Sequence, residues 1–395
     1  MGWISQALKR KKPLLKQLLV YYGYPISING TWNVDRAVSI YKNYDLLVFG
    51  DRYQFPAHSS YTDTIKIIAK LREEKPSIEI FGYVAIGLAP SSTNNLTIQE
   101  IKERVDLWKN AGATGIFLDT FGYDYQVTRD RQNEVVQYCH SQGFNVFVNS
   151  EKLDYVFKKE NMYLDGIDFY GNPNNLEPVI GPRDYYMIEN AFYDYSSSQQ
   201  TMRGSSRSRL VENIEYFTVK RDEYGGLTYY EKFRASFIAL DELSDRDQDY
   251  FNNGYIGSVV LGYHGYGASI RSWGSSISDY NHYAVPDIPY DVGDHIGTPI
   301  VSRNTPSSSS NTKYENTLGK IKLTLVWDPD PTDDRNLAKG TRHVLINDHI
   351  VGYSSGITER RPKMAQVGFM YFDTTLGKPM WWNGTGWVDS TNKTV

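Results

Sequence analysis

Short apolar runs alternate with longer amphipathic stretches along residues 18–265. The runs are rich in Val, Ile, Phe and Tyr and are bounded by Gly, Asn, Asp or Pro, as β-strands are. Eight such runs are present: 18–22, 45–50, 78–86, 115–119, 145–149, 166–170, 185–189 and 258–263. The pattern predicts a strand at each of them.

The stretches between these runs have the periodicity of amphipathic helices. Thr97 followed by Glu100 has the spacing of a capping box, and Gly143 is typical of a helix C-terminus. Four stretches are predicted as helices: 61–74, 97–111, 130–142 and 231–243.

Strands that alternate with helices indicate a parallel α/β fold. Eight strands close a (β/α)8 TIM-like barrel, for which about 250 residues is the usual length. An open doubly wound sheet is the alternative, and it would need a glycine-rich phosphate loop after the first strand. The first run leads into Tyr22-Gly23-Tyr24-Pro25, which lacks that pattern. We therefore predict a barrel over residues 17–290.

Composition narrows the classes of partner. The chain of 395 residues carries 46 acidic and 42 basic side chains, a formal net charge of −4, which does not suit a general nucleic-acid or membrane-surface binder. Cys139 is the only cysteine, so an intrachain disulfide framework and a cysteine-based zinc site are excluded. No apolar run approaches the roughly 18 residues of a membrane span, so no membrane insertion is expected.

Aromatic residues are abundant, with 8 Trp, 32 Tyr and 16 Phe. Their flat faces and polar edges suit clefts that hold sugars, although a β-rich fold also uses many aromatics. We expect no metal and no cofactor, because no motif for either is present.

The two ends of the chain differ from the barrel region. Residues 1–16 form a basic segment without an acid, and no long apolar stretch follows, so a secretory signal is not expected. Residues 291–318 contain a Ser-rich polar stretch and are predicted as a linker. Short β-like runs return in 319–395, which predicts a small β-rich module.

Reactive groups of such barrels stand at the C-terminal ends of the strands. The polar residues at the predicted ends are Asp51, Asp119, Asn149, Glu151, Asp168, Glu189 and His264. Asp119 closes the fourth run and Glu189 the seventh, so we expect them to face one another across the barrel mouth. Two carboxylates there can bracket a glycosidic bond, one as proton donor and the other as nucleophile or charge stabiliser. The alternative is structural, with each carboxylate capping a helix or pairing with an arginine.

Other residues near the predicted mouth suit the binding of a sugar. Asp51, Asn149 and Asp168 are candidates to bind sugar hydroxyls. Stacking walls are predicted from Tyr22, Tyr24, Tyr83, Tyr123 and Tyr170, although packing in the barrel core is the commoner fate of an aromatic residue in a strand.

Residues 20–267 resemble the barrel glycosidases of the polygalactosaminidase and spherulin-4 group. The resemblance rests on Tyr21-Tyr22-Gly23, the runs 45–50 and 115–119, and the segment Glu189-Asn190-Ala191-Phe192. It implies that Asp119 and Glu189 are the catalytic pair. The group also has a second Asp soon after the strand-four Asp, for which Asp124 is the only candidate in this chain.

Residues 367–389 resemble the C-terminal ends of bacteriophage tail and fibre proteins, especially of phages that infect gut Bacteroidetes-type hosts. The matching string runs from Val367-Gly368-Phe369 through Trp381-Trp382-Asn383-Gly384 to Val388-Asp389. It implies a module for virion or surface attachment and no reaction of its own.

Together these features predict a phage tail protein whose barrel hydrolyses polysaccharide at the host cell surface. The C-terminal module would bind other virion proteins or form a homo-oligomer. The alternative is a non-catalytic carbohydrate-binding or structural virion protein on the same fold. The separation of the two carboxyls tests the choice, because about 5–10 Å across a shared cleft supports hydrolysis.

Overall fold

A computed structural model describes most of the barrel region and shorter parts of the C-terminal region. The described residues are 15–88, 95–196, 201–204, 216, 220–243, 248–270, 302–304, 312–318, 321–327, 343–346, 349–350, 355–356, 358, 361, 370–391 and 393–394. Nearly all of the predicted basic segment 1–16, and the Ser-rich stretch within the predicted linker, lie outside them.

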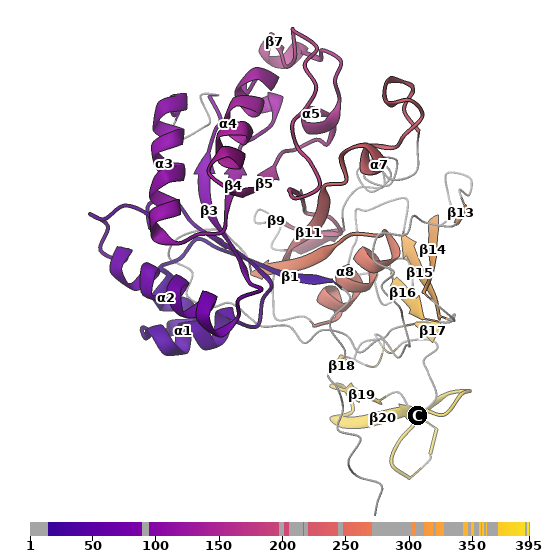
Figure 1. Cartoon of the computed structure of the whole chain (residues 1–395). Helices are drawn as coiled ribbons and strands as arrows, with labels where there is room; N and C mark the ends of the chain where they lie inside the picture. The colour runs from indigo at the N-terminus through magenta and orange to yellow at the C-terminus, as the bar shows by residue number, and fades with distance from the viewer. Residues whose placement is uncertain are drawn as a thin grey trace, which may run out of the picture.

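Eight parallel strands close into a barrel, as predicted (Figure 1). In order around the barrel they are β1 (Lys16–Tyr21), β12 (Gly265–Ile270), β11 (Ser236–Leu243), β8 (Tyr185–Glu189), β5 (Asn145–Asn149), β4 (Gly115–Asp119), β3 (Glu79–Ala85) and β2 (Leu46–Phe49). The helices flank the strands on the outside; they are α1 (Val34–Tyr41), α2 (Tyr61–Glu74), α3 (Ile98–Ala111), α4 (Arg129–Ser141), α5 (Asp154–Phe157), α7 (Tyr229–Phe233) and α8 (Gln248–Val260).

The interior of the barrel is filled by alternate residues of its strands. Phe81, Phe117 and Phe147 are fully buried and meet edge to face, with the Phe147 ring 5.5 Å from Phe81 and 5.4 Å from Phe117. Because side chains alternate across a strand, the residue two positions after each interior phenylalanine also points inward. For Phe117 and Phe147, that residue is the last one of the strand.

Three of the predicted helices are confirmed. Helix α2 has the predicted bounds, and α4 is shifted by one residue. Helix α3 follows its N-cap Thr97, and the predicted capping box is present: Thr97 accepts from the backbone N–H of Glu100, and Glu100 accepts from that of Thr97. The capping box satisfies backbone N–H groups that have no partner within the helix.

Two of the eight predicted barrel strands, the sixth and the eighth, are wrong. Run 166–170 is no barrel strand, because it forms the turn η3 (Asp165–Ile167) and the short strand β7 (Phe169–Tyr170) of an exposed hairpin. Run 258–263 ends helix α8 and continues into a turn. The seventh strand, β11, lies inside the stretch predicted as a helix, and the eighth, β12, follows directly after run 258–263.

Packing on two sides explains why the end of α8, residues 258–260, was predicted as part of a strand. The helix contacts β11 and β12 of the barrel and also β14, β15 and β16 beyond it. A helix covered on two sides is apolar around most of its circumference, so the amphipathic pattern is lost. Gly254 and Gly257 allow this close packing, since a Cβ at either would lie within 2.1 Å of Tyr266 or 2.7 Å of Phe192.

Among the residues that the structure describes, two small sheets follow the barrel. The first pairs β13 (Ser302–Asn304), β14 (Thr312–Leu318), β15 (Ile321–Trp327), β16 (His343–Ile346) and β17 (His349–Ile350). Two of these strands, β13 and β14, lie within the predicted linker 291–318. Asn316 of β14 donates to the Val259 and Val260 carbonyls of α8, both at 3.3 Å, so this sheet packs directly against the barrel.

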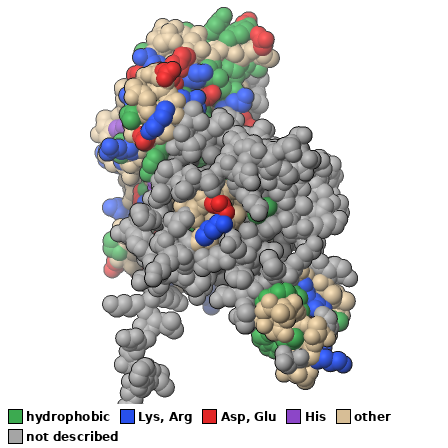
Figure 2. All heavy atoms as spheres, turned by 90° about the vertical axis from the view of Figure 1, so that its right-hand side faces the viewer, with side chains coloured by type: hydrophobic (Ala, Val, Ile, Leu, Met, Phe, Trp, Pro, Cys, Tyr) green, Lys and Arg blue, Asp and Glu red, His purple; other side chains and the backbone are tan. Residues whose placement is uncertain are grey.

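The second sheet pairs β18 (Ser355–Gly356), β19 (Met370–Asp373), β20 (Lys378–Trp382) and β21 (Trp387–Val388). Trp382 lies opposite Trp387 with ring centroids 5.6 Å apart, and both are buried in a cluster with Tyr371 and Met380. Residues 383–386, which include Asn383 and Gly384, form the turn between them, and Trp381 lies on the other face. The described part of this sheet is the lobe at the lower right of Figure 2, with apolar and basic side chains on the face turned to the viewer.

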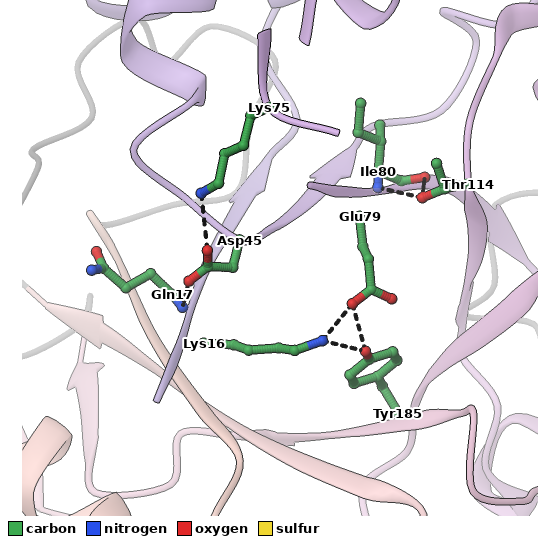
Figure 3. Close-up of polar contacts among 8 residues, drawn as sticks. All are labelled: Lys16, Gln17, Asp45, Lys75, Glu79, Ile80, Thr114 and Tyr185. Carbon is green, nitrogen blue, oxygen red and sulfur yellow. Dashed lines mark hydrogen bonds and ion pairs between the residues drawn. The ribbon is translucent and has the colours of Figure 1, made fainter. Parts of the chain in front are cut away.

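The N-terminal end of the barrel is closed by a polar cluster of first strand residues (Figure 3). Lys16 begins β1, Glu79 begins β3 and Tyr185 begins β8. Lys16 pairs with Glu79, and the Tyr185 hydroxyl lies 2.7 Å from both the Lys16 nitrogen and Glu79 Oε1. These charges satisfy one another at the end of the barrel opposite the strand C-termini.

Candidate active site

A pocket of about 290 Å³ opens at the C-terminal ends of the barrel strands. It combines carboxylates, an amide, hydroxyls and aromatic and apolar side chains. The lining residues are Val20, Tyr22, Asp119, Thr120, Tyr125, Asn149, Ser150, Glu151, Met187 and Glu189. Concave sites with a few convergent polar groups are the usual form of ligand-binding sites.

Three of the predicted residues meet at the floor of this pocket. Asp119, Asn149 and Glu189 are the last residues of β4, β5 and β8, which are consecutive around the barrel. The side-chain nitrogen of Asn149 donates to Asp119 Oδ1 at 3.0 Å and to Glu189 Oε2 at 3.0 Å. Since one nitrogen contacts both, these two oxygens can be no more than about 6 Å apart.

The relative position of the two carboxylates differs from the prediction. We expected Glu189 on the seventh strand, facing Asp119 across the barrel. Because run 166–170 is not in the barrel, Glu189 ends the sixth strand, and only β5 separates it from Asp119. This shorter separation is what allows Asn149 to bridge them.

A left-handed backbone conformation follows each carboxylate. Thr120 has φ +53° and Asn190 has φ +51°. Asn tolerates this region, but for a β-branched residue such as Thr it is strained. The Thr120 hydroxyl accepts from the Gly87 backbone N–H at 2.9 Å, which holds the turn. Such strain tends to occur at functional sites, where the surrounding structure maintains it.

Tyr83 binds Asp119 directly, and Tyr22 packs against Tyr83. The Tyr83 hydroxyl donates to Asp119 Oδ2 at 2.6 Å, and burial, followed by the charge of Asp119, raises the pKa of Tyr83 far above its ordinary value. The Tyr22 ring lies edge-on to Tyr83 with centroids 5.4 Å apart and forms part of the pocket wall. Both oxygens of Asp119 thus accept a hydrogen bond from a neutral donor, which fixes the plane of its carboxylate.

The structure does not bring all predicted binding residues to the pocket. Asp51 forms an ion pair with Arg104 of α3, with oxygens 2.7 and 2.8 Å from Nη1. Tyr123 is fully buried and accepts from Arg129 at 2.9 Å, so its ring belongs to the core. Asp51 and Tyr123 therefore have the structural roles that the sequence left open as alternatives.

Asp168 and Tyr170 lie on the exposed hairpin of β6 (Tyr163–Leu164) and β7, away from the pocket lining. The Tyr163 hydroxyl donates to Asp168 at 2.9 Å. The hairpin takes the place of the sixth strand that the sequence predicted, and this removes both residues from the barrel mouth.

His264 lies at the opposite end of the barrel. It directly precedes β12 instead of following the last strand, and its backbone carbonyl accepts from the Lys16 N–H at 3.0 Å. Its position beside the first residue of β1 separates it from the pocket at the strand C-termini.

Several pocket residues were not predicted as site residues. Thr120 and Ser150 each directly follow a predicted site residue. Val20 and Met187 lie at inward-facing positions of their strands, where side chains alternate between the two faces. Tyr125 lies at the end of the turn η2 (Tyr123–Tyr125). Burial is the main cause that raises the pKa of its phenol, and the neighbouring carboxylates add to it.

Asp124, the candidate for the second Asp of the resembled group, lies in the same turn. It does not line the pocket, and its Oδ1 is buried without a hydrogen-bond partner. Burial is the main cause that raises its pKa, and the negative charge of Glu151 adds to it.

Among the described residues, no group of three or more His, Cys, Asp or Glu side chains is placed to hold a metal ion. Within the same residues, no helix has the length and apolar character needed to cross a membrane.

The fold and the site together define a (β/α)8 barrel with a carboxylate pocket at its mouth. No protein-family model and no curated protein matches the sequence. Among solved structures, the chain is similar to the glycoside hydrolase domain of PelA from Pseudomonas aeruginosa, at 12% identity and TM-score 0.38, covering 67% of this chain and 99% of that one.

Two further solved structures are similar to this chain. Alpha-galactosidase I from Mortierella vinacea matches at 9% identity and TM-score 0.43, covering 81% of this chain and 82% of that one. A type I 3-dehydroquinate dehydratase from Clostridium difficile matches at 9% identity and TM-score 0.34, covering 68% and 89%. The TIM-like barrel itself is shown by the closed strand order of this chain. The predicted phage role finds no support in these similarities.

Proposed function

We propose that this protein is a glycoside hydrolase in which Asp119 and Glu189 carry the reaction. The observation that carries the proposal is the Asn149 side-chain nitrogen, 3.0 Å from an oxygen of each carboxylate, at the floor of an open pocket. Retaining glycosidases hold their two carboxyl groups about 5–5.5 Å apart, whereas inverting enzymes need about 6.5–9.5 Å. A nearest-oxygen separation of at most about 6 Å favours retention.

We assign the nucleophile to Asp119 because Tyr83 and Asn149 fix both of its oxygens. An Asp119 oxygen forms a bond to the anomeric carbon as the glycosidic C–O bond breaks, and Glu189 gives its proton to the leaving oxygen. Glu189 then takes a proton from water, whose oxygen attacks the anomeric carbon and releases Asp119. Two displacements restore the original anomeric configuration.

A second candidate is a non-catalytic carbohydrate-binding or structural virion protein on the same barrel. Asp124 favours it, because the second Asp of the resembled glycosidases would have to be this residue, and it does not line the pocket. In that case the same pocket would bind a sugar without cleaving it.

The biological setting that we propose is a phage tail, with polysaccharide at the host cell surface as the substrate. The string 367–389 supports it through its likeness to tail-fibre ends. Met370, Phe372 and Leu376 expose apolar surface on or beside β19, which suits attachment to other virion proteins or to further copies of the chain.

The test compares wild type with Asp119→Asn and Glu189→Gln on capsule and exopolysaccharide of candidate hosts. Both variants keep side-chain shape and remove the charge or proton that the reaction needs, so release of reducing ends should fall at least about a thousandfold. Asp168→Asn is the matched control on the exposed hairpin and should leave the rate unchanged. NMR of the first products should show the anomer of the substrate. Wild-type protein that binds these glycans but releases no reducing ends would establish the binding alternative.

A further inference from the structure

Four ring side chains form a continuous cluster in the loops after β1 and β2, which we call the aromatic platform: Tyr24, Trp32, Tyr53 and His58. The Tyr24 ring centroid lies 6.4 Å from that of Trp32, 6.1 Å from Tyr53 and 6.1 Å from His58. Trp32 is 66% exposed and Tyr24 is 39% exposed, whereas Tyr53 is buried beneath them.

The aromatic platform adjoins the pocket through the loop that follows β1. The Tyr53 hydroxyl donates to the backbone carbonyl of Tyr22 at 3.0 Å, and Tyr22 is a pocket wall. Tyr24 follows Tyr22 by two residues, which limits their Cα separation to about 7 Å. Both loops leave the C-terminal ends of their strands, so pocket and platform share the catalytic face of the barrel.

Trp32 is held in its exposed position against the preference of its backbone. Its φ is +44°, a left-handed conformation that is a genuine outlier for a bulky residue. The neighbours on both sides are fixed: the Thr31 hydroxyl donates to the Ile26 carbonyl at 2.8 Å, and Asn33 caps α1 by accepting from the Arg36 N–H at 3.0 Å. The fold thus maintains a strained backbone at a tryptophan whose ring gains little burial, which points to a function for that ring.

We propose that the aromatic platform binds sugar rings of the same polysaccharide chain whose bond lies between Asp119 and Glu189. The inference rests on the proposed function and specifies its substrate as a polymer long enough to reach from the two carboxylates to the platform. A sugar is the occupant that fits best. Trp32 and Tyr24 offer exposed ring faces for pyranose stacking, and the platform lies beside the wall of the carboxylate pocket.

The test measures binding without hydrolysis, in the full chain carrying Glu189→Gln. The probes are α-1,4-linked galactosamine and β-1,4-linked glucosamine polymers, their N-acetylated forms, and the disaccharide of each. Affinity is measured from the retention of the protein by each polymer and from the change in intrinsic fluorescence on binding. Trp32→Gly removes the ring and relieves the positive φ, so the protein should stay as stable or become more stable. Trp32→Phe keeps a stacking face. Phe372→Ala is the matched control, an exposed ring on β19 of the small C-terminal sheet.

We expect at least one polymer to bind, and its affinity to fall about tenfold or more in Trp32→Gly, with most of it kept in Trp32→Phe and all of it in Phe372→Ala. Disaccharide affinity should not change in any of the three. Equal polymer affinity of Trp32→Gly and its parent, equal loss for polymer and disaccharide, or no binding of any polymer would overturn the inference. Failure of the proposed function is a separate outcome: wild type would release no reducing ends from a polymer that the platform binds.

Discussion

The Tyr83 hydroxyl donates a 2.6 Å hydrogen bond to Oδ2 of Asp119. The two residues lie on the neighbouring strands β3 and β4, and both point into the barrel mouth because they follow the interior residues Phe81 and Phe117 by two positions. Burial and the charge of Asp119 keep the phenol protonated, since both raise its pKa far above the ordinary value. Tyr83 is therefore a permanent donor to the proposed nucleophile.

Tyr83→Phe should lower kcat about tenfold to a hundredfold with little change in KM. The variant removes one hydrogen bond to a charged group, which is worth about 1.5–3 kcal/mol, and keeps the ring that packs against Tyr22. Steady-state kinetics on the cleaved polysaccharide measure the effect. Tyr170→Phe, which loses a hydroxyl on the exposed hairpin, is the control. An unchanged kcat in Tyr83→Phe would show that the bond does not assist the reaction.

Asn149→Asp should shift the whole pH–rate profile toward higher pH and reduce its maximum. The substitution places a third carboxylate within hydrogen-bond distance of Asp119 and Glu189. Like charges disfavour the ionised forms, so the apparent pKa values of the coupled groups rise and both limbs of the profile move upward. Asn149→Ala, which removes the bridge without adding charge, should lose activity with a smaller shift. An unchanged pH–rate profile would show that residue 149 does not interact with the groups whose titration controls the reaction.

Six of the eight barrel strands could be predicted because each is an apolar run with clear turn residues at its ends. The strand β11 could not, since Thr228 and Glu231 begin a real short helix just before it and no Gly, Pro, Asn or Asp separates the helix from the strand. Helix α8 is covered on two sides, which removes the periodicity that distinguishes a helix from a strand.

The same errors limited the prediction of the site. Asp119, Asn149 and Glu189 were predicted because a polar residue that ends an apolar strand is visible in the sequence. Their hydrogen bonds were not predicted, because the Asn149 bridge depends on which strands are neighbours in the barrel. The predicted strand order was wrong because it included run 166–170, which is not a barrel strand. The ion pair of Asp51 with Arg104 joins residues that are 53 positions apart, and such a pairing has no local signal.

Deletion of residues 377–395 should leave the barrel folded and its hydrolysis unchanged. It removes β20 and β21, whose Met380, Trp382 and Trp387 pack with Tyr371 in a cluster separate from those of the barrel. The attachment role predicts that self-association or incorporation into particles is lost, which light scattering and recovery in assembled virions measure. A truncated chain that assembles normally would remove that role, and one whose barrel unfolds would show that the segment supports the barrel core.

The last prediction concerns stability toward acid and depends on His264. Burial, followed by the positive charge of Lys16, lowers the pKa of this histidine from 6.5 to about 4. The ring is held in its neutral form, with Nδ1 accepting from the Phe237 N–H at 3.2 Å and Nε2 lying 3.3 Å from the Tyr230 hydroxyl. Nδ1 must be unprotonated to accept that bond.

Because the pKa is lower in the folded state, the unfolded chain binds more protons between pH 6.5 and 4. The contribution of His264 is therefore fully present above pH 6.5 and is lost as the pH falls toward 4, by up to about 3 kcal/mol. Denaturant unfolding across this range should show a steep loss of the free energy of unfolding in wild type and a shallower one in His264→Asn, whose amide oxygen can still accept from Phe237. Equal slopes for wild type and His264→Asn would assign the acid sensitivity to other groups.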